Sequence, residues 1–237
     1  MGFHVTEYLL YRDGQSRSVK DLTPEELNYL VAATDALVWD CVLAYVAWVG
    51  EESVSSEMKE VFNENPAVVA HLEANPYFKN FAHRLTTAEG YSSWGAALNE
   101  IASGSADIAD EVGATKIAQP YADKHVEDVE SWYSWHSLDD YQNNIHSIKN
   151  AYLGGRDDNS RTATSLSGYV KERNPELDAN IKSKIEDCLT KIKAIGTGGR
   201  SFYEVVRDQV NEAEVDAAAE VCAELGRLFS SVADIID

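Results

Sequence analysis

The stretch LDDYQNNIHSIKNAYL, residues 138–153, contains the periodicity that decides the fold. Its apolar side chains recur every three or four residues, so an α-helix would gather them on one face. These side chains are Leu138, Tyr141, Ile145, Ile148 and Tyr152. Gly154 and Gly155 follow at once, and glycine is the residue that most often ends a helix. The stretch therefore predicts an amphipathic helix with one buried side.

The rest of the chain repeats this pattern. Residues 2–12 predict a helix that stops near Asp13-Gly14. Thr23-Pro24-Glu25-Glu26 is typical of a helix start, because threonine caps the end, proline fits the first turn and acids suit the positive end of the helix dipole. This helix should run to about Gly50, and residues 87–120 predict one long helix or two in line. No segment alternates with period two, and no Asn-Gly or Asp-Gly hairpin joins β-branched segments. The sequence predicts an all-α fold.

Charge excludes several classes of partner. The 237 residues include 40 acidic and 20 basic side chains, for a net charge of −20. Nucleic acid and anionic membrane surfaces need clustered lysine and arginine, so neither is an expected partner. No run of 18 consecutive apolar residues occurs, which predicts no transmembrane helix, and the first residues do not have the pattern expected of a signal peptide.

The three cysteines lie singly inside helix-like stretches. Cys41, Cys188 and Cys222 lack the C-x-x-C spacing of a metal framework. We expect them to be small buried apolar side chains. A disulfide between one pair in an oxidising compartment remains an alternative.

The segment GFHVTEYLL, residues 2–10, reads G-x-H-x-x-E. In a helix, His4 and Glu7 are three residues apart and share a face. An imidazole beside a carboxylate can bind a divalent metal ion or act as an acid/base pair. The simpler alternative is a hydrogen bond across a helix surface.

Four acidic residues are candidates to complete a metal site. Asp107, Asp110 and Glu111 form a one-sided patch on the predicted helix, and Glu130 follows later in the chain. Such a patch is usually a solvated face, but it could supply oxygen ligands if it faces the His4 helix. Mixed nitrogen and oxygen ligands suit iron, zinc or manganese better than calcium.

Aromatic and histidine residues elsewhere have structural explanations. We expect Trp132, Tyr133 and Trp135 to pack between helices, with a haem or siderophore platform as the alternative. Four histidines are expected to be surface or capping groups, namely His71, His83, His136 and His146. Residues 2–10 can also be aligned with residues 144–152, which places His146 on His4 and Lys149 on Glu7. This alignment hints at two related helical halves.

The chain resembles the imelysin-like family, in particular its Bacteroidetes type. The resemblance is carried by three segments: GFHVTEYLL at residues 2–10, DIADEVG at 107–113, and the run from ESWYS at 130–134 through SLDDYQNNI at 137–145 to NAYLG at 150–154. It implies one all-α domain over residues 1–237 with two bundle-like halves, residues 1–86 and 87–237, and with the G-x-H-x-x-E site near their interface.

The resemblance also implies a periplasmic or surface-anchored lipoprotein with a link to iron. Members of the family have further helices before this motif, so we expect the first half to be incomplete. Membrane tethering would then depend on a missing N-terminal lipid anchor, and exposed helix faces would be covered by a partner or by self-association.

Three functions are compatible with these observations. The first is an exported protein that binds a metal ion or an iron-related ligand through His4 and Glu7. The second is a metallopeptidase of the imelysin type, although the sequence lacks the H-E-x-x-H and G-x-S-x-G motifs. The third is a non-catalytic helical interaction protein in which the His–Glu pair is structural. Metal content distinguishes the first function from the third.

Overall fold

The computed structural model describes residues 2–50, 54–63, 91, 93–162 and 164–236. The chain divides into two compact units, Met1–Ala97 and Leu98–Asp237. The described residues are helical apart from one short hairpin and the connecting segments, so the predicted all-α class is confirmed. The predicted boundary between residues 86 and 87 lies outside the described residues, as do His71 and His83.

The first unit begins with a short helix and a tight hairpin. Its described elements are α1 (Phe3–Leu10), β1 (Tyr11–Arg12), β2 (Gln15–Ser16), η1 (Val19–Asp21), α2 (Pro24–Val49) and α3 (Ser56–Asn63). The predicted extension of the first helix to residue 12 is wrong, because α1 ends at Leu10 and the chain reverses at Asp13-Gly14. Both turn residues have positive φ, 50° and 74°, which is the geometry that makes Asp-Gly a two-residue hairpin turn.

Helix α2 starts where the sequence predicts. The Thr23 hydroxyl accepts the Glu26 N–H at 3.2 Å, and the Glu26 carboxylate accepts the Thr23 N–H at 2.9 Å. This capping box satisfies N–H groups that the helix itself leaves unpaired.

Helix α2 is also long and apolar. It has 26 residues, and one window of it has a mean hydropathy of 1.7, enough to cross a membrane by length and composition. The prediction of no transmembrane helix rested on the lack of an uninterrupted apolar run, which Asp35 and Asp40 break in α2, and it stays a prediction. Only 17% of that window is buried, and the exposed large apolar side chains of α2 are Tyr29, Val31, Val38, Tyr45 and Trp48. A core helix or a signal sequence passes the same test, so the finding concerns composition and not location.

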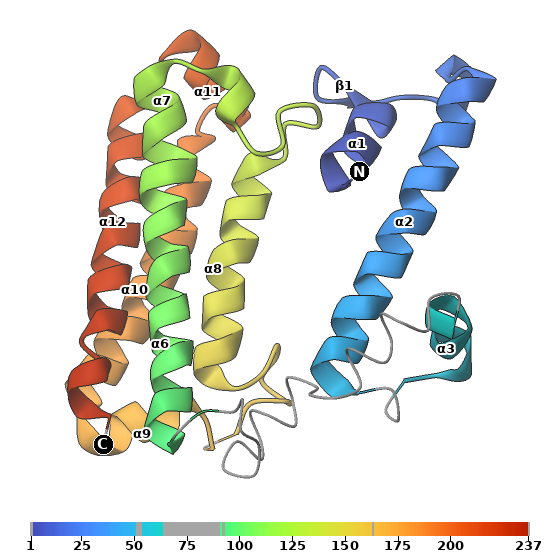
Figure 1. Cartoon of the computed structure of the whole chain (residues 1–237). Coiled ribbons are helices and arrows are strands. Elements are labelled where there is room, and N and C mark those ends of the chain that lie inside the picture. Colours follow the sequence, from blue (N-terminus) through green and yellow to red (C-terminus); the bar gives the residue numbers. More distant parts are fainter. Residues whose placement is uncertain (1, 51–53, 64–90, 92, 163, 237) are drawn as a thin grey trace. The chain divides into compact units, whose positions relative to one another are not determined.

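The second unit consists of helices packed side by side (Figure 1). With the helix that leads into it, its elements are α6 (Trp94–Asp110), η4 (Glu111–Ala118), α7 (Gln119–Asp123), η5 (Val126–Asp128), α8 (Ser137–Leu153), α9 (Leu166–Arg173), α10 (Pro175–Ile195), α11 (Phe202–Asp208), α12 (Glu212–Ser230) and η6 (Ala233–Ile235). Helix α10 contacts both α8 and α12, and α12 also packs on η4.

Segments α6, η4 and α7 follow one another without a break, which agrees with the predicted long helix from Trp94 to Pro120, while residues 87–90 and 92 of that prediction lie outside the described residues. The middle segment η4 is a π-helix, whose hydrogen bonds span five residues instead of four. Side chains five residues apart therefore come closer on η4 than they would on an α-helix.

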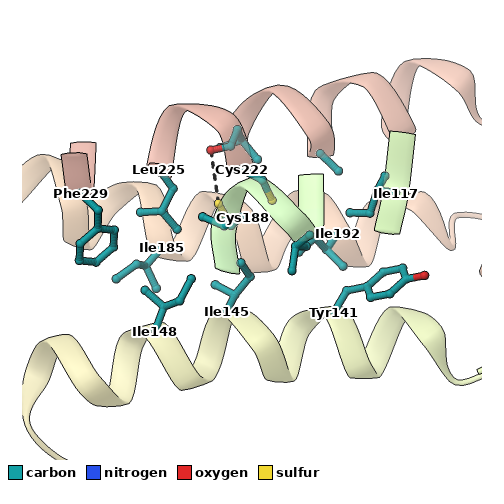
Figure 2. Packing of buried hydrophobic residues seen from close by; sticks show 14 of the residues in the cluster. Ile117, Tyr141, Ile145, Ile148, Ile185, Cys188, Ile192, Cys222, Leu225 and Phe229 are labelled. Atoms are coloured by element: carbon teal, nitrogen blue, oxygen red, sulfur yellow. Dashed lines mark hydrogen bonds between the residues drawn. The ribbon is translucent and has the colours of Figure 1, made fainter. Parts of the chain in front are cut away.

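The core of the second unit is built on the apolar stripe of α8. Tyr141, Ile145, Ile148 and Tyr152 are each at most 1% exposed. Figure 2 shows side chains of α8 directed at Ile185 and Ile192 of α10. Burial of such side chains contributes roughly 2 kcal/mol each. The predicted apolar face is confirmed.

The three cysteines differ in environment. Cys188 and Cys222 are fully buried between α10 and α12, as expected, whereas Cys41 is exposed on α2. The expectation of burial is therefore wrong for Cys41, which lies on the exposed side of its helix. A hydrogen bond with Cys222, together with burial, raises the pKa of the Cys188 thiol far above its ordinary value. All three are free thiols.

This difference predicts selective labelling. A maleimide should modify Cys41 rapidly in the native protein and should reach Cys188 and Cys222 only after denaturation, because the thiolate is the reacting form and needs access. Mass spectrometry of native and urea-denatured samples measures this difference. Cys41→Ser should abolish native labelling, and rapid double labelling of that variant would contradict the packing of α10 on α12.

Candidate functional site

Helix α1 brings together the His and Glu of the G-x-H-x-x-E motif. His4 Nδ1 lies 3.1 Å from Glu7 Oε2. The His4 side chain is 62% exposed and that of Glu7 is 12% exposed. When Nδ1 carries the proton and donates a hydrogen bond to Glu7 Oε2, Nε2 keeps its lone pair. The pair therefore presents one oriented imidazole nitrogen that can bind an electrophile.

Arg17 ties this helix to the start of α2. Its Nη1 donates to the Leu9 carbonyl at 3.3 Å, and its Nη2 donates to both carboxylate oxygens of Glu26 at 3.0 and 3.1 Å. Hydrogen bonds from the Thr23 N–H and then from Arg17 lower the pKa of Glu26. Arg17 thus links the last turn of α1 to the capping box of α2. The sequence does not reveal this role of Arg17, because nothing in the local pattern marks a contact nine residues away.

A second His–acid pair provides a comparison. His125 Nδ1 lies 3.0 Å from Asp128 Oδ2, with the same three-residue spacing, and this hydrogen bond raises the pKa of His125. The spacing and distance are therefore not unique to the motif. What differs is the carboxylate, because Asp128 is 51% exposed whereas Glu7 is nearly buried.

The four acidic candidates of the second unit do not share one environment. Asp107 is exposed on α6. The Asp110 carboxylate lies against Gly226 of α12, so closely that a Cβ there would overlap it. Glu111 and Glu130 face the Lys116 ammonium, with oxygens 3.6 and 3.1 Å from its Nζ.

Lys116 organises this part of the second unit. Besides the two glutamates, its Nζ donates to Asn144 Oδ1 of α8 at 3.0 Å. Glu111 and Lys116 are five residues apart, a pairing that an α-helix does not favour but that the wider turn of η4 permits. The ammonium supplies a positive charge between two of the proposed metal ligands. Among the described residues, no group of three or more His, Cys, Asp or Glu side chains is placed to hold a metal ion.

The aromatic segment packs as expected. The Trp135 ring stacks on Tyr203 with centroids 5.2 Å apart, and Trp132 and Tyr133 are 4.3 Å apart. Trp132 also packs against the core of the second unit. Helix α8 begins at Ser137, and the Ser137 hydroxyl accepts the Ser131 N–H at 3.2 Å.

Residues 1–232 match the model of the Imelysin family (Peptidase M75). The chain belongs to the imelysin family. Comparison with curated proteins gave no match.

Two solved structures resemble this imelysin-family chain. One, from Parabacteroides distasonis, is described as an iron-regulated protein A precursor; it is 30% identical, covers 100% of this chain and superposes with a TM-score of 0.73. The other, described as an imelysin peptidase from Bacteroides ovatus, is 32% identical over 83% of this chain, with a TM-score of 0.58. The chain spans 64% and 53% of the lengths of these two proteins.

Proposed function

We propose that this chain is an exported, iron-related binding protein that holds a divalent metal ion or a metal-containing ligand through α1. His4 would bind the metal through Nε2. Glu7 would orient the imidazole through Nδ1, as carboxylates commonly do for metal-binding histidines. Support comes from the 3.1 Å His4–Glu7 contact and from a relative described as an iron-regulated precursor.

The donor set fits such a metal in part. The His4 imidazole nitrogen is a donor that iron and zinc accept, and the Glu7 carboxylate supplies an oxygen donor only if it gives up its hydrogen bond to Nδ1. Two donors are fewer than a tight site needs, so water or further residues must fill the remaining positions. Asp107, Asp110, Glu111 and Glu130 stay predicted contributors. For Glu111 and Glu130, Lys116 would first have to be displaced, because it already neutralises them.

Metal content by mass spectrometry tests the proposal. Wild-type protein, His4→Ala and Glu7→Ala are loaded with Fe²⁺ or Zn²⁺ and then freed of unbound metal. We expect bound metal in the wild type and at least a tenfold loss of affinity in both variants, because outer partners of a ligating histidine matter by about 10–100-fold.

His125→Ala is the matched control, because it removes an exposed histidine with the same acidic partner geometry. It should leave metal content unchanged. Equal metal in wild type and His4→Ala would contradict the proposal. Peptide hydrolysis that a chelator abolishes and His4→Ala removes would instead identify a metallopeptidase.

A further inference from the structure

A surface hollow lies at the C-terminal end of α8. It has a volume of about 480 Å³, and its lining consists of Asn143, His146, Ser147, Lys149, Asn150, Arg156 and Arg161. Every one of these side chains can donate a hydrogen bond. Within the part of the chain that the structure describes, no carboxylate belongs to this lining. Such a lining is unexpected in a chain with twice as many acidic as basic residues.

The local fold explains why these residues meet. Asn143, His146, Ser147 and Asn150 are spaced three, one and three residues apart, so they form one outer stripe of α8, away from its buried stripe. Gly154 ends α8 in the left-handed conformation, φ 75°, and turns the chain back.

The loop after Gly154 is held by its own hydrogen bonds. The Asp157 carboxylate accepts the N–H groups of Asn159 and Ser160, both at 2.9 Å. Arg161 Nε donates to the Gly155 carbonyl at 3.3 Å. These contacts hold the backbone of the loop that carries Arg156 and the side chain of Arg161 without a ligand, which lowers the ordering cost of binding.

Among the residues that the structure describes, two of the four basic side chains of the lining have no acidic partner. Lys149 pairs with Glu186 at 2.5 Å and Arg161 pairs with Asp158 at 2.5 Å. By contrast, Arg156 and His146 make no hydrogen bond or ion pair with any described residue. The hollow therefore has donors that are not compensated by carboxylates.

The alignment of residues 2–10 with residues 144–152 agrees with this lack of carboxylates in the lining. His146 occupies the position of His4, and Lys149 occupies the position of Glu7. An imidazole next to a carboxylate favours a cation, whereas an imidazole next to an ammonium favours an anion.

We propose that this hollow is a binding site for a multivalent oxyanion, such as phosphate or a polycarboxylate. The Arg156 guanidinium supplies a planar fork that matches two oxygens of the anion. Lys149 and Arg161, whose charges are already paired with Glu186 and Asp158, add hydrogen-bond donors, and the amide groups of Asn143 and Asn150 add neutral donors. The competing explanation is that these cations only complement the negative C-terminal end of the α8 dipole.

Isothermal titration calorimetry on the full chain separates the two explanations. Inorganic phosphate and citrate are titrated separately in a chloride buffer of matched ionic strength. We expect saturable binding of at least one anion, weakened at least about tenfold by Arg156→Ala and by His146→Ala, since each removes one charge-assisted contact. Arg156→Lys should restore only part of the affinity, because lysine keeps the charge and loses the fork.

Lys191→Ala is the control, because Lys191 is exposed on α10 outside the lining and its loss changes the net charge equally. Circular dichroism confirms that each variant is folded. Binding of phosphate would identify an inorganic oxyanion as the ligand, and binding of citrate would identify a polycarboxylate. Non-saturable heats for both anions, or an equal loss in Lys191→Ala, would overturn the proposal and leave the dipole explanation. The metal proposal for His4 is unaffected by either outcome.

Discussion

Asp178→Ala is expected to lower the free energy of unfolding by about 3 kcal/mol. Asp178 is 4% exposed, and its Oδ1 accepts the Tyr152 hydroxyl at 2.9 Å and the Ser167 hydroxyl at 2.7 Å. Its Oδ2 accepts from Lys182 Nζ at 2.8 Å. Alanine would leave two buried hydroxyl groups without their acceptor, and each such loss costs about 1–3 kcal/mol.

Two further variants separate the contribution of the Asp178 hydrogen bonds from that of its charge. Asp178→Asn retains a carbonyl oxygen for Tyr152 and Ser167 but loses the charge opposite Lys182, so it should cost about half as much. Lys182→Ala should cost less than about 1 kcal/mol, because the Lys182 side chain is 41% exposed and its ion pair is screened. Urea denaturation followed by circular dichroism measures all three. If the alanine variant fell within about 0.5 kcal/mol of wild type, the network would not stabilise the fold.

The same carboxylate makes stability depend on pH. Burial acts to raise the pKa of Asp178, but hydrogen bonds from Lys182, Ser167 and Tyr152 outweigh it, so the pKa in the folded protein is lowered. The unfolded chain then binds this proton more readily. The contribution is present above the ordinary carboxyl pKa of about 4 and is lost as pH falls through the lower pKa of the folded state. The stability difference between wild type and Asp178→Asn should therefore shrink only below about pH 4.

Asp178 also shows how far sequence periodicity extends. The buried positions of α10 include 181, 185, 188 and 192, and position 178 falls on the same stripe. An acid on an apolar stripe, with a lysine four residues later, is a signal that the sequence does contain. Its partner Tyr152 lies on another helix, 26 residues away, and local periodicity carries no information about which helices meet.

The contacts of the candidate site also fall into local ones, which the sequence predicts, and tertiary ones, which it does not. The three-residue spacing of His4 and Glu7 is local, and it correctly predicts that the two side chains touch. The spacing of Asp107, Asp110 and Glu111 is also local, but an α-helical interpretation cannot anticipate the π-helix that begins at Glu111. Lys116 reaches Glu130 and Asn144 only through tertiary packing. Patterns therefore predicted contacts within an element and missed the contacts between elements.

The close approach of η4 and α12 makes Gly113 sensitive to substitution. Gly113→Ala should destabilise the protein by about 1–2 kcal/mol. A Cβ on Gly113 would lie 2.9 Å from the Ala219 carbonyl oxygen and 2.9 Å from Cys222 Cβ, both on α12. Neither atom is at the end of a flexible side chain, so the helices must separate, which costs more than the roughly 1 kcal/mol that alanine gains over glycine in a helix.

Gly104→Ala is the matched variant, because it makes the same change earlier in the same run of helical segments. A Cβ on Gly104 would have no neighbour within 4 Å. Only the helix propensity changes there, so this variant should be more stable than wild type by about 0.5–1 kcal/mol. The two substitutions are expected to shift the urea midpoint in opposite directions. If both raised it, η4 and α12 would not pack as closely as this structure has them, and the burial of Cys222 between the helices would have to be reconsidered.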